Sequence, residues 1–487
     1  MALLLAACVS APVHEQSWQE VRTRHFDISS SLGTNETQQL AEDLENFRSG
    51  VEYLVDAKLP APALRTRVYA FDGRRVVRPF DRRGVSGYFL PSLDGGWIVL
   101  RTGGGWRHDA TTELRFEFAR YLFRNREGLD LPLWYDEGFG QFASTLEPVE
   151  GGIEVGLARP DFIHLLRDRL HLSVEGLIQL QDLTQQTARE REIFDAESWA
   201  LVHYLTFESG SPAQARQRFR HYLDQVERGT SFRIALESSF GEGPAQIKKG
   251  VSRYVREKSF HSMVLRLPPR ATRNPEPRTL EAPNARARLG WLAIELGRPE
   301  TASRYFDMTL AEQPNNVSAL AGRIAAARID ENWKAAESHY ASALAIAPAD
   351  PLVQLEGGHA ALASAFRATS PSQARQRASL ARERLQQSIQ ELATNPAAYT
   401  LLGRTYLVPG EDPSLGLSPI TKARQLLPSS LEIELVRARL QLARGDATHA
   451  AYLAREIASR TTSKKLAAKA LDLAREAREA STFRKSE

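Results

Sequence analysis

The chain has 487 residues, of which 42% are hydrophobic and 25% are charged, and its formal net charge is +4. This length corresponds to about three soluble globular domains with ample apolar residues for a core. The small net charge, without a dense basic run interleaved with aromatic residues, argues against a nucleic-acid partner. The sequence has no apolar run of 18 or more residues that could form a membrane-spanning helix.

The chain has a single cysteine, Cys8, so an intramolecular disulfide is impossible. The preceding Leu4-Leu5-Ala6-Ala7 resembles a bacterial lipobox, in which the cysteine becomes the lipidated N-terminus. The alternative is an apolar N-terminus with a chance cysteine, because only Met1 precedes the run and a basic segment is missing. On the lipoprotein interpretation, residues 1–17 are a signal remnant and tether. Val9 after the cysteine then predicts an outer-membrane lipoprotein of the bacterial cell envelope that faces the periplasm, held by its lipid anchor.

Residues 18–148 predict an α+β subdomain, a small sheet with helices. A strand is expected over Val21–Ser30, and a helix from Thr34 to Ala57, where apolar residues from Leu40 to Leu54 recur at steps of three and four. Further strands are expected at Thr66–Phe71, Gly87–Leu90 and Trp97–Arg101. Two helices follow, one through residues 116–120 with Asp109 as its N-cap, and one over Leu133–Leu146.

The rest of the chain predicts helices. Residues 149–263 are expected to form a helical subdomain and residues 264–284, rich in Pro and Arg, a linker. Residues 285–487 predict tetratricopeptide-like repeats, because Pro314 and Pro348 lie 348 − 314 = 34 residues apart. Counted back from these prolines, Ala302 and Phe306 correspond to Ala336 and Tyr340, the small and aromatic positions of the repeat. Later units are expected around Pro396, Pro428 and Gly445, with a polar capping helix from Ser463. The concave surface of such an array predicts a protein or peptide partner.

Residues 116–120 read Phe-Glu-Phe-Ala-Arg, and Glu137 follows at the distance that a zinc peptidase would use. In an H-E-x-x-H helix the histidines at i and i+4 hold zinc, and the intervening Glu activates water. Here Phe116 and Arg120 stand at those positions. Phenylalanine has no lone pair to donate, and arginine stays protonated and repels a dication. The sequence therefore predicts an inactive remnant site, formed by Phe116, Glu117, Arg120 and Glu137, with no metal and no cofactor.

Residues 18–260 resemble a family of bacterial envelope proteins, a domain of unknown function classed with the peptidase-MA-like (gluzincin) metallopeptidases. The resemblance rests mainly on Pro-Leu-Trp-Tyr-Asp-Glu-Gly at 132–138 and Ser-Trp-Ala-Leu-Val-His-Tyr-Leu at 198–205. Members often continue into tetratricopeptide repeats, as this chain does. The resemblance implies that an active member carries zinc on residues matching positions 116, 120 and 137, with the Glu at 117 as general base. Of these, Glu117 and Glu137 remain.

Three functional hypotheses follow. In the first, the protein is an inactive peptidase-like lipoprotein in which Arg120 pairs with Glu137, and with Glu117, where zinc would lie; the repeats then bind a protein partner. In the second, it is a metallopeptidase with relocated ligands, for which His108, His164 and His203 are the nearest candidates. None of the three has a His or Cys three or four residues further on, and His203 is expected to be a core residue beside Trp199 and Tyr204. In the third, the protein is a structural scaffold for envelope assembly.

Overall fold

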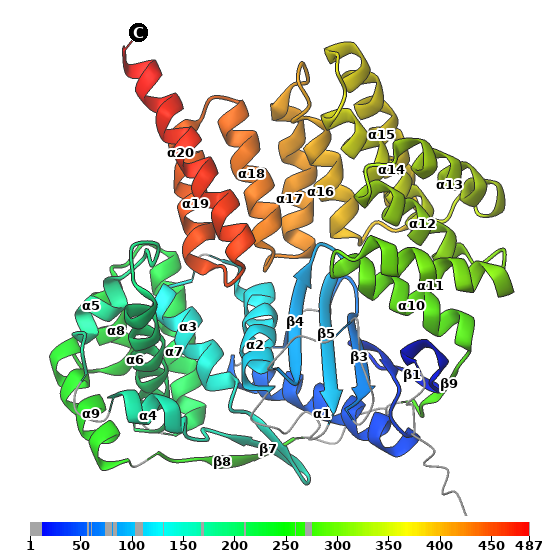
Figure 1. Ribbon diagram of the computed structural model, residues 1–487. Helices are drawn as coiled ribbons and strands as arrows, with labels where there is room; N and C mark the ends of the chain where they lie inside the picture. The colour runs from blue at the N-terminus through cyan, green and yellow to red at the C-terminus, as the bar shows by residue number, and fades with distance from the viewer. Residues whose placement is uncertain are drawn as a thin grey trace, which may run out of the picture. The chain divides into compact units, whose positions relative to one another are not determined.

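The computed structural model describes residues 12–55, 58–59, 61–73, 80, 85–102, 111–129, 131–166, 170–208, 211–258, 260–267 and 275–486. Cys8, His108 and Asp109, for which the sequence makes predictions, lie outside these described residues. The chain forms two compact units (Figure 1), each from three segments. Unit 1 consists of Met1–Ala41, Ala63–Trp106 and Asn274–Leu426, and unit 2 of Glu42–Pro62, Arg107–Arg273 and Leu427–Glu487. The units therefore do not follow the linear order of the segments expected from the sequence.

Unit 1 contains a six-stranded mixed sheet with the order β4-β5-β3-β2-β1-β9. Its strands are β1 (Trp18–Arg22), β2 (Phe26–Ser30), β3 (Thr66–Asp72), β4 (Gly87–Ser92), β5 (Gly95–Thr102) and β9 (Arg278–Leu280). Strand β3 pairs in parallel with β2 and with β5, and the other neighbours are antiparallel. The connection from β2 to β3 contains α1 (Thr34–Leu54), as the apolar periodicity predicts; α1 begins in unit 1 and ends in unit 2.

The segment expected to be one strand over Val21–Ser30 is a hairpin. The backbone N–H of Thr23 donates to the carbonyl of Phe26, and the Thr23 hydroxyl accepts the Phe26 N–H at 3.0 Å. This four-residue turn ends β1 and starts β2. Strand β1 pairs with β2 along one edge and with β9 along the other. A side-chain hydrogen bond of this kind competes with the extended backbone, which is why a hydrophobicity pattern alone did not locate the break.

Eight helices of unit 1 form four antiparallel pairs that carry the predicted repeats. They are α10 (Ala282–Glu295), α11 (Pro299–Glu312), α12 (Val317–Ile329), α13 (Trp333–Ile346), α14 (Pro351–Phe366), α15 (Pro371–Glu391), α16 (Pro396–Thr405) and α17 (Leu417–Leu426). Ala302, Phe306, Ala336 and Tyr340 are buried, as the repeat pattern predicts. A Cβ on Gly322 would lie 2.2 Å from the Phe306 ring, so only glycine lets the next helix approach this aromatic side chain.

The first repeat packs directly on the sheet. Trp18, Tyr69, Phe71 and Trp97 share one apolar core with residues of α10, α11 and α12. Strand β9 leads into α10 with one residue between them, so the C-terminal end of the predicted 264–284 linker is a strand and the first turn of a helix. The N-terminal end of that segment belongs to β8 (Met263–Arg266), in the sheet of unit 2. The Pro and Arg content of residues 264–284 suggested a linker. Both ends of this segment are strands instead, because alternate side chains of a short strand can be buried even in a polar segment, as Leu265 and Leu280 are.

Unit 2 combines helices with a second small sheet. The three-stranded sheet has the order β6-β7-β8, and its first two strands are β6 (Glu147–Val149) and β7 (Gly152–Val155). The expectation that the chain after residue 146 is helical is therefore wrong for these strands. Its helices are α2 (Thr112–Glu127), α3 (Leu133–Ala143), α4 (Pro160–Leu166), α5 (Val174–Gln179), α6 (Ala188–Phe207), α7 (Pro212–Glu227), α8 (Phe232–Phe240), α9 (Pro244–Glu257), α18 (Leu431–Ala443), α19 (Ala447–Arg460) and α20 (Lys464–Ser486). The last of these is the expected capping helix.

The fold class agrees with the sequence: an α+β part with a small sheet and helices precedes a long tetratricopeptide-like helical array. The chain crosses between the units inside this array, after Leu426, so that α18, α19 and α20 belong to unit 2. Within the described ranges, none of the helices combines the length and the apolarity that a bilayer crossing requires.

Candidate functional site

Three side chains of α2 line up on one helical face in unit 2. Phe116, Arg120 and Arg124 are spaced four residues apart and are all buried. The same spacing in an H-E-x-x-H helix would put two imidazoles side by side. Helix α3 packs against this face at a glycine: a Cβ on Gly140 would lie 2.6 Å from Cγ of Arg120 and 2.9 Å from the Phe116 ring. Gly140 therefore lets α3 lie directly on the stem of Arg120.

The guanidinium group of Arg120 pairs with two consecutive carboxylates of α3. Its Nη2 lies 2.6 Å from Oε1 of Glu137 and 3.1 Å from Oδ2 of Asp136. The predicted pairing of Arg120 with Glu137 is therefore confirmed. Pairing with Glu117 is not seen; Oε1 of Glu117 is buried without a hydrogen-bond partner. The aromatic ring of Phe116 lies 5.0 Å from the guanidinium carbon of Arg120, a cation–π distance.

Asp136 is the centre of this network, and the sequence prediction missed it. The residue is fully buried (0% exposed) and accepts hydrogen bonds from Arg120 and from Nε and Nη2 of Arg124. The spacing of Arg120 and Arg124 on one helical face could have indicated a buried acidic partner. A third guanidinium, from Arg460 at the end of α19, lies 3.8 Å from Asp136 and also pairs with Glu456 at 2.9 Å. No local pattern could have indicated Arg460, which is more than 300 residues away.

We refer to these six residues as the Arg120 cluster: Arg120, Arg124, Arg460, Asp136, Glu137 and Glu456. It balances three guanidinium groups with three carboxylates. Burial of an unpaired charge costs several kcal/mol, so a neutral sum is what allows the cluster to lie in the interior. Arginine suits this role because its planar fork offers five donors and stays charged.

Local electrostatics hold the cluster in its charged form around Asp136. Burial alone would raise the pKa of Asp136, but Arg124 and Arg120 hold the pKa of this carboxyl well below its usual range. Burial would lower the pKa of Arg120, and the Glu137 and Asp136 carboxylates more than offset this, so its pKa is raised. Burial raises the pKa of Glu137; the guanidinium of Arg120 opposes that shift, and the neighbouring Asp195 adds to it.

A cavity of about 370 Å³ lies beside the cluster. Glu113, Phe116, Arg120, Glu137 and Gln141 line one part of it. The rest is lined by residues of the segment after α5, of α6, of α19, of the α19–α20 connection and of α20, including Leu183, Thr184, Arg191, Asp195, Ala458, Ser459, Arg460, Thr461, Thr462 and Lys464. Burial raises the pKa of Asp195 to about 6, with a further contribution from Glu113. Three of the four residues of the predicted remnant site thus meet at one cavity, and the fourth, Glu117, is not among its lining residues.

The residues present do not fit a zinc ion. Nitrogen or sulfur ligands would have to replace Phe116 and Arg120, and Glu137 is already paired with the Arg120 guanidinium at 2.6 Å. In the described ranges, no group of three or more His, Cys, Asp or Glu side chains could hold a metal ion. A guanidinium can still donate hydrogen bonds to a carbonyl oxygen, but it cannot generate a hydroxide nucleophile as a bound metal does.

Of the histidines considered as relocated ligands, the two that the structure describes, His164 and His203, do not gather here. His203 is buried in unit 2, where Nε2 lies 2.9 Å from the carbonyl of Gly156 and Nδ1 lies 2.9 Å from the Tyr254 hydroxyl. Its ring meets Trp199 edge-on at 5.4 Å, as expected for a core residue. Burial lowers its pKa to about 4, so the ring is neutral at pH 7. His164 is exposed on α4.

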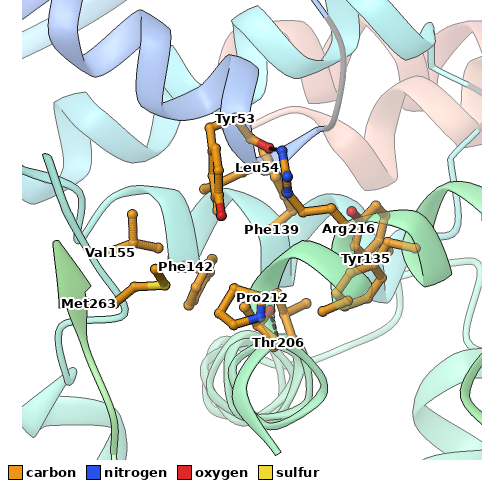
Figure 2. Close-up of a pocket in the computed structure, with 13 residues that line it drawn as sticks. Tyr53, Leu54, Tyr135, Phe139, Phe142, Val155, Thr206, Pro212, Arg216 and Met263 are labelled. Carbon is orange, nitrogen blue, oxygen red and sulfur yellow. Dashed lines mark hydrogen bonds between the residues drawn. The ribbon is translucent and has the colours of Figure 1, made fainter. Parts of the chain in front are cut away.

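The opposite face of α3 is apolar (Figure 2). Tyr135, Phe139 and Phe142 point toward a pocket of about 10 Å³ that Tyr53, Val155 and Met263 also line. This volume is about that of one water molecule, so side chains essentially fill the pocket. Arg216 closes one side, with its guanidinium carbon 3.8 Å from the Tyr53 ring centre. Helix α3 therefore separates packed apolar core from the polar cavity at the Arg120 cluster.

No protein-family model and no curated protein matches the chain. Among solved structures, it is similar to a thermophilic tetratricopeptide repeat protein of Thermus thermophilus, with 19% identity, a TM-score of 0.35, and coverage of 41% of this chain and 98% of that one. It is also similar to PilW, a type IV pilus biogenesis factor (16% identity, TM-score 0.32, coverage 43% and 94%). A third similar structure is yeast Tom70 (13% identity, TM-score 0.31, coverage 60% and 61%). The helix pairs themselves identify the repeats. The resemblance to peptidase-MA-like proteins stays a prediction.

Proposed function

We propose that the protein is a catalytically inactive, peptidase-like protein of the bacterial cell envelope that binds a protein partner through its tetratricopeptide-like repeats. The observation that carries the proposal is the ion pair of Arg120 with Glu137 at 2.6 Å, on the helical face where a peptidase would present imidazole ligands. A permanent cation there neutralises the carboxylate that would otherwise bind the metal. In this proposal Cys8 carries the lipid anchor, and the protein faces the periplasm from the outer membrane.

The repeats of unit 1 offer a surface for a partner, although one part of them is already covered. Leu93, at the tip of the β4–β5 hairpin, packs against the core of α14, α15 and α16. Outside that contact, Phe366, Leu380 and Leu415 are large apolar side chains exposed on the array. Exposed apolar side chains of this size are the kind that a partner buries. We therefore place the partner on the part of the array that the hairpin leaves open.

Photo-crosslinking in cells tests the interaction. A photoreactive amino acid at Leu415 or Phe366 is expected to capture one discrete protein, whereas the same amino acid at Ile234 is not. Ile234 is as exposed as Leu415 but lies on α8, outside the repeats. If the repeat positions capture nothing, or only what Ile234 also captures, the interaction role is refuted.

Two further measurements test the rest of the proposal. Purified protein is expected to contain no stoichiometric zinc and to leave peptide substrates intact after incubation with zinc. Stoichiometric metal would support the alternative of a metallopeptidase with non-standard ligands. The Cys8→Ser variant is expected to leave the membrane fraction; if it remains there, the lipid-anchor proposal is wrong.

A further inference from the structure

The last turn of α19 forms part of the wall of the cavity at the Arg120 cluster. The carbonyl of Arg460 belongs to the final turn of this helix, and such carbonyls have no partner within their own helix. Here the carbonyl oxygen accepts hydrogen bonds from Nη2 of Arg120 and Nη2 of Arg124, both at 3.3 Å. The carboxyl end of a helix carries partial negative charge, so two guanidinium groups are the complementary partners.

The side chains of this turn form hydrogen bonds with two further segments of unit 2. Nη2 of Arg460 donates to the carbonyl of Leu131, just before α3, at 2.9 Å. The hydroxyl of Ser459 donates to Oδ1 of Asp182 at 2.8 Å and accepts the backbone N–H of Leu183 at 3.3 Å. The end of α19 thus makes polar contacts with α2, with the segment before α3 and with the segment after α5.

Ordinary packing of a terminal repeat does not account for these contacts. A helix that only completes a solenoid covers its neighbour with apolar side chains, as Leu453 and Ile457 of α19 do. It has no need to bury an arginine, yet Arg460 is only 7% exposed. Burial of that charge is tolerated because Asp136 and Glu456 form ion pairs with the guanidinium group and the Leu131 carbonyl accepts a hydrogen bond from it.

We infer that the polar face that α2 and α3 present at the Arg120 cluster is a receptor for the carboxyl end of a helix, and that α19 of the same chain is its ligand. The paired guanidinium groups of Arg120 and Arg124 bind the Arg460 carbonyl by hydrogen bonds, where a metal centre would bind a carbonyl as a Lewis acid. The inference goes beyond the proposed function and does not depend on peptidase ancestry, since it rests on these contacts alone. Its consequence is that the receptor is filled in cis and holds the last repeats against α2 and α3 within unit 2.

Hydrogen exchange of the full-length protein, read by mass spectrometry, tests the receptor from both sides. In Arg460→Ala, amides at the end of α19 and amides of residues 128–137 and 181–184 are all expected to exchange about tenfold faster or more, because the contact that protects them is lost. Arg460→Lys keeps the charge without the fork and is expected to lie between that variant and the native protein. Arg439→Ala, at an exposed arginine of α18, is the matched control and is expected to exchange like the native protein.

The inference is overturned if Arg460→Ala accelerates exchange in α19 alone, or nowhere, because the lost side chain joins the end of α19 to the Leu131 carbonyl and to Asp136, and both sides of a receptor must loosen without it. Should that variant fail to fold, Ser459→Ala carries the test. It removes the hydroxyl that accepts the Leu183 N–H, so the amide of Leu183 is expected to exchange faster while α18 is unchanged. Unchanged exchange at Leu183 in Ser459→Ala would then refute the receptor. None of these readouts depends on metal or on peptidase activity, so failure here is separable from failure of the proposed function.

Discussion

Arg120→Ala is the most informative single substitution, because it removes one cation from a balanced buried network. Arg120 is 2% exposed and contacts Glu137 at 2.6 Å, Asp136 at 3.1 Å and the Arg460 carbonyl at 3.3 Å. Asp136 keeps Arg124 and Arg460 as partners, so most of the cost falls on Glu137. Loss of one partner from a buried ion pair costs about 3–5 kcal/mol, since the remaining charge stays desolvated. We expect a loss of that size in the free energy of unfolding of unit 2.

A double-mutant cycle separates the pair from the rest of the site. Arg120→Met keeps a long apolar stem, and Glu137→Gln removes the charge but keeps the shape. The double variant is expected to be more stable than Arg120→Met alone by about 1–3 kcal/mol, because no unpaired carboxylate remains. Arg126→Ala is the control on α2; Arg126 is partly exposed and lies 3.7 Å from Glu127, so its removal costs less than about 1 kcal/mol.

Urea unfolding followed by circular dichroism measures the global effect, and hydrogen exchange in α2 and α3 measures the local one. Both are needed because the two units of the chain need not unfold together. If Arg120→Ala changes stability no more than Arg126→Ala does, or if Glu137→Gln does not relieve Arg120→Met, the buried ion-pair network is not what stabilises this site.

Two other predictions concern metal and pH. The double variant Phe116→His with Arg120→His is expected to acquire zinc on the two imidazoles and Glu137, which metal analysis after dialysis measures; persistent absence of metal would count against a peptidase-like arrangement of α2 and α3. Burial raises the pKa of Glu197 from 4.5 to about 7, although its carboxylate accepts the Leu172 N–H. The folded state therefore binds this proton more tightly than the unfolded state, so the contribution to stability is full below pH 4.5 and declines as the pH rises through 7. Glu197→Gln, which cannot ionise, is expected to be more stable than the native protein at pH 8 by on the order of 2–3 kcal/mol, with little difference at pH 4.5. Urea midpoints at the two pH values measure this, and an equal difference at both would show that ionisation of Glu197 is not the cause.

The sequence by itself determined the features that depend on local periodicity. Helix α1 follows from apolar residues every three or four positions, and the repeats follow from small and aromatic residues 34 apart, such as Ala302 and Phe306 against Ala336 and Tyr340. The pairing of Arg120 with Glu137 could also be predicted. Arg120 replaces the second histidine of a known motif, Glu137 retains the third ligand position, and buried opposite charges pair with each other.

Only the tertiary structure decided the rest, because it depends on residues far apart in the chain. Short strands such as β9 have too few residues for a period, and a pairing partner, here β1, defines them. Asp136 could not be placed at the centre of the cluster from its neighbours alone, because its third cation comes from Arg460. The same holds for the end of α19: nothing near Arg460 in the sequence indicates that its carbonyl meets Arg120 and Arg124. Local sequence encodes which face of an element is buried, whereas long-range packing selects the surface that buries it.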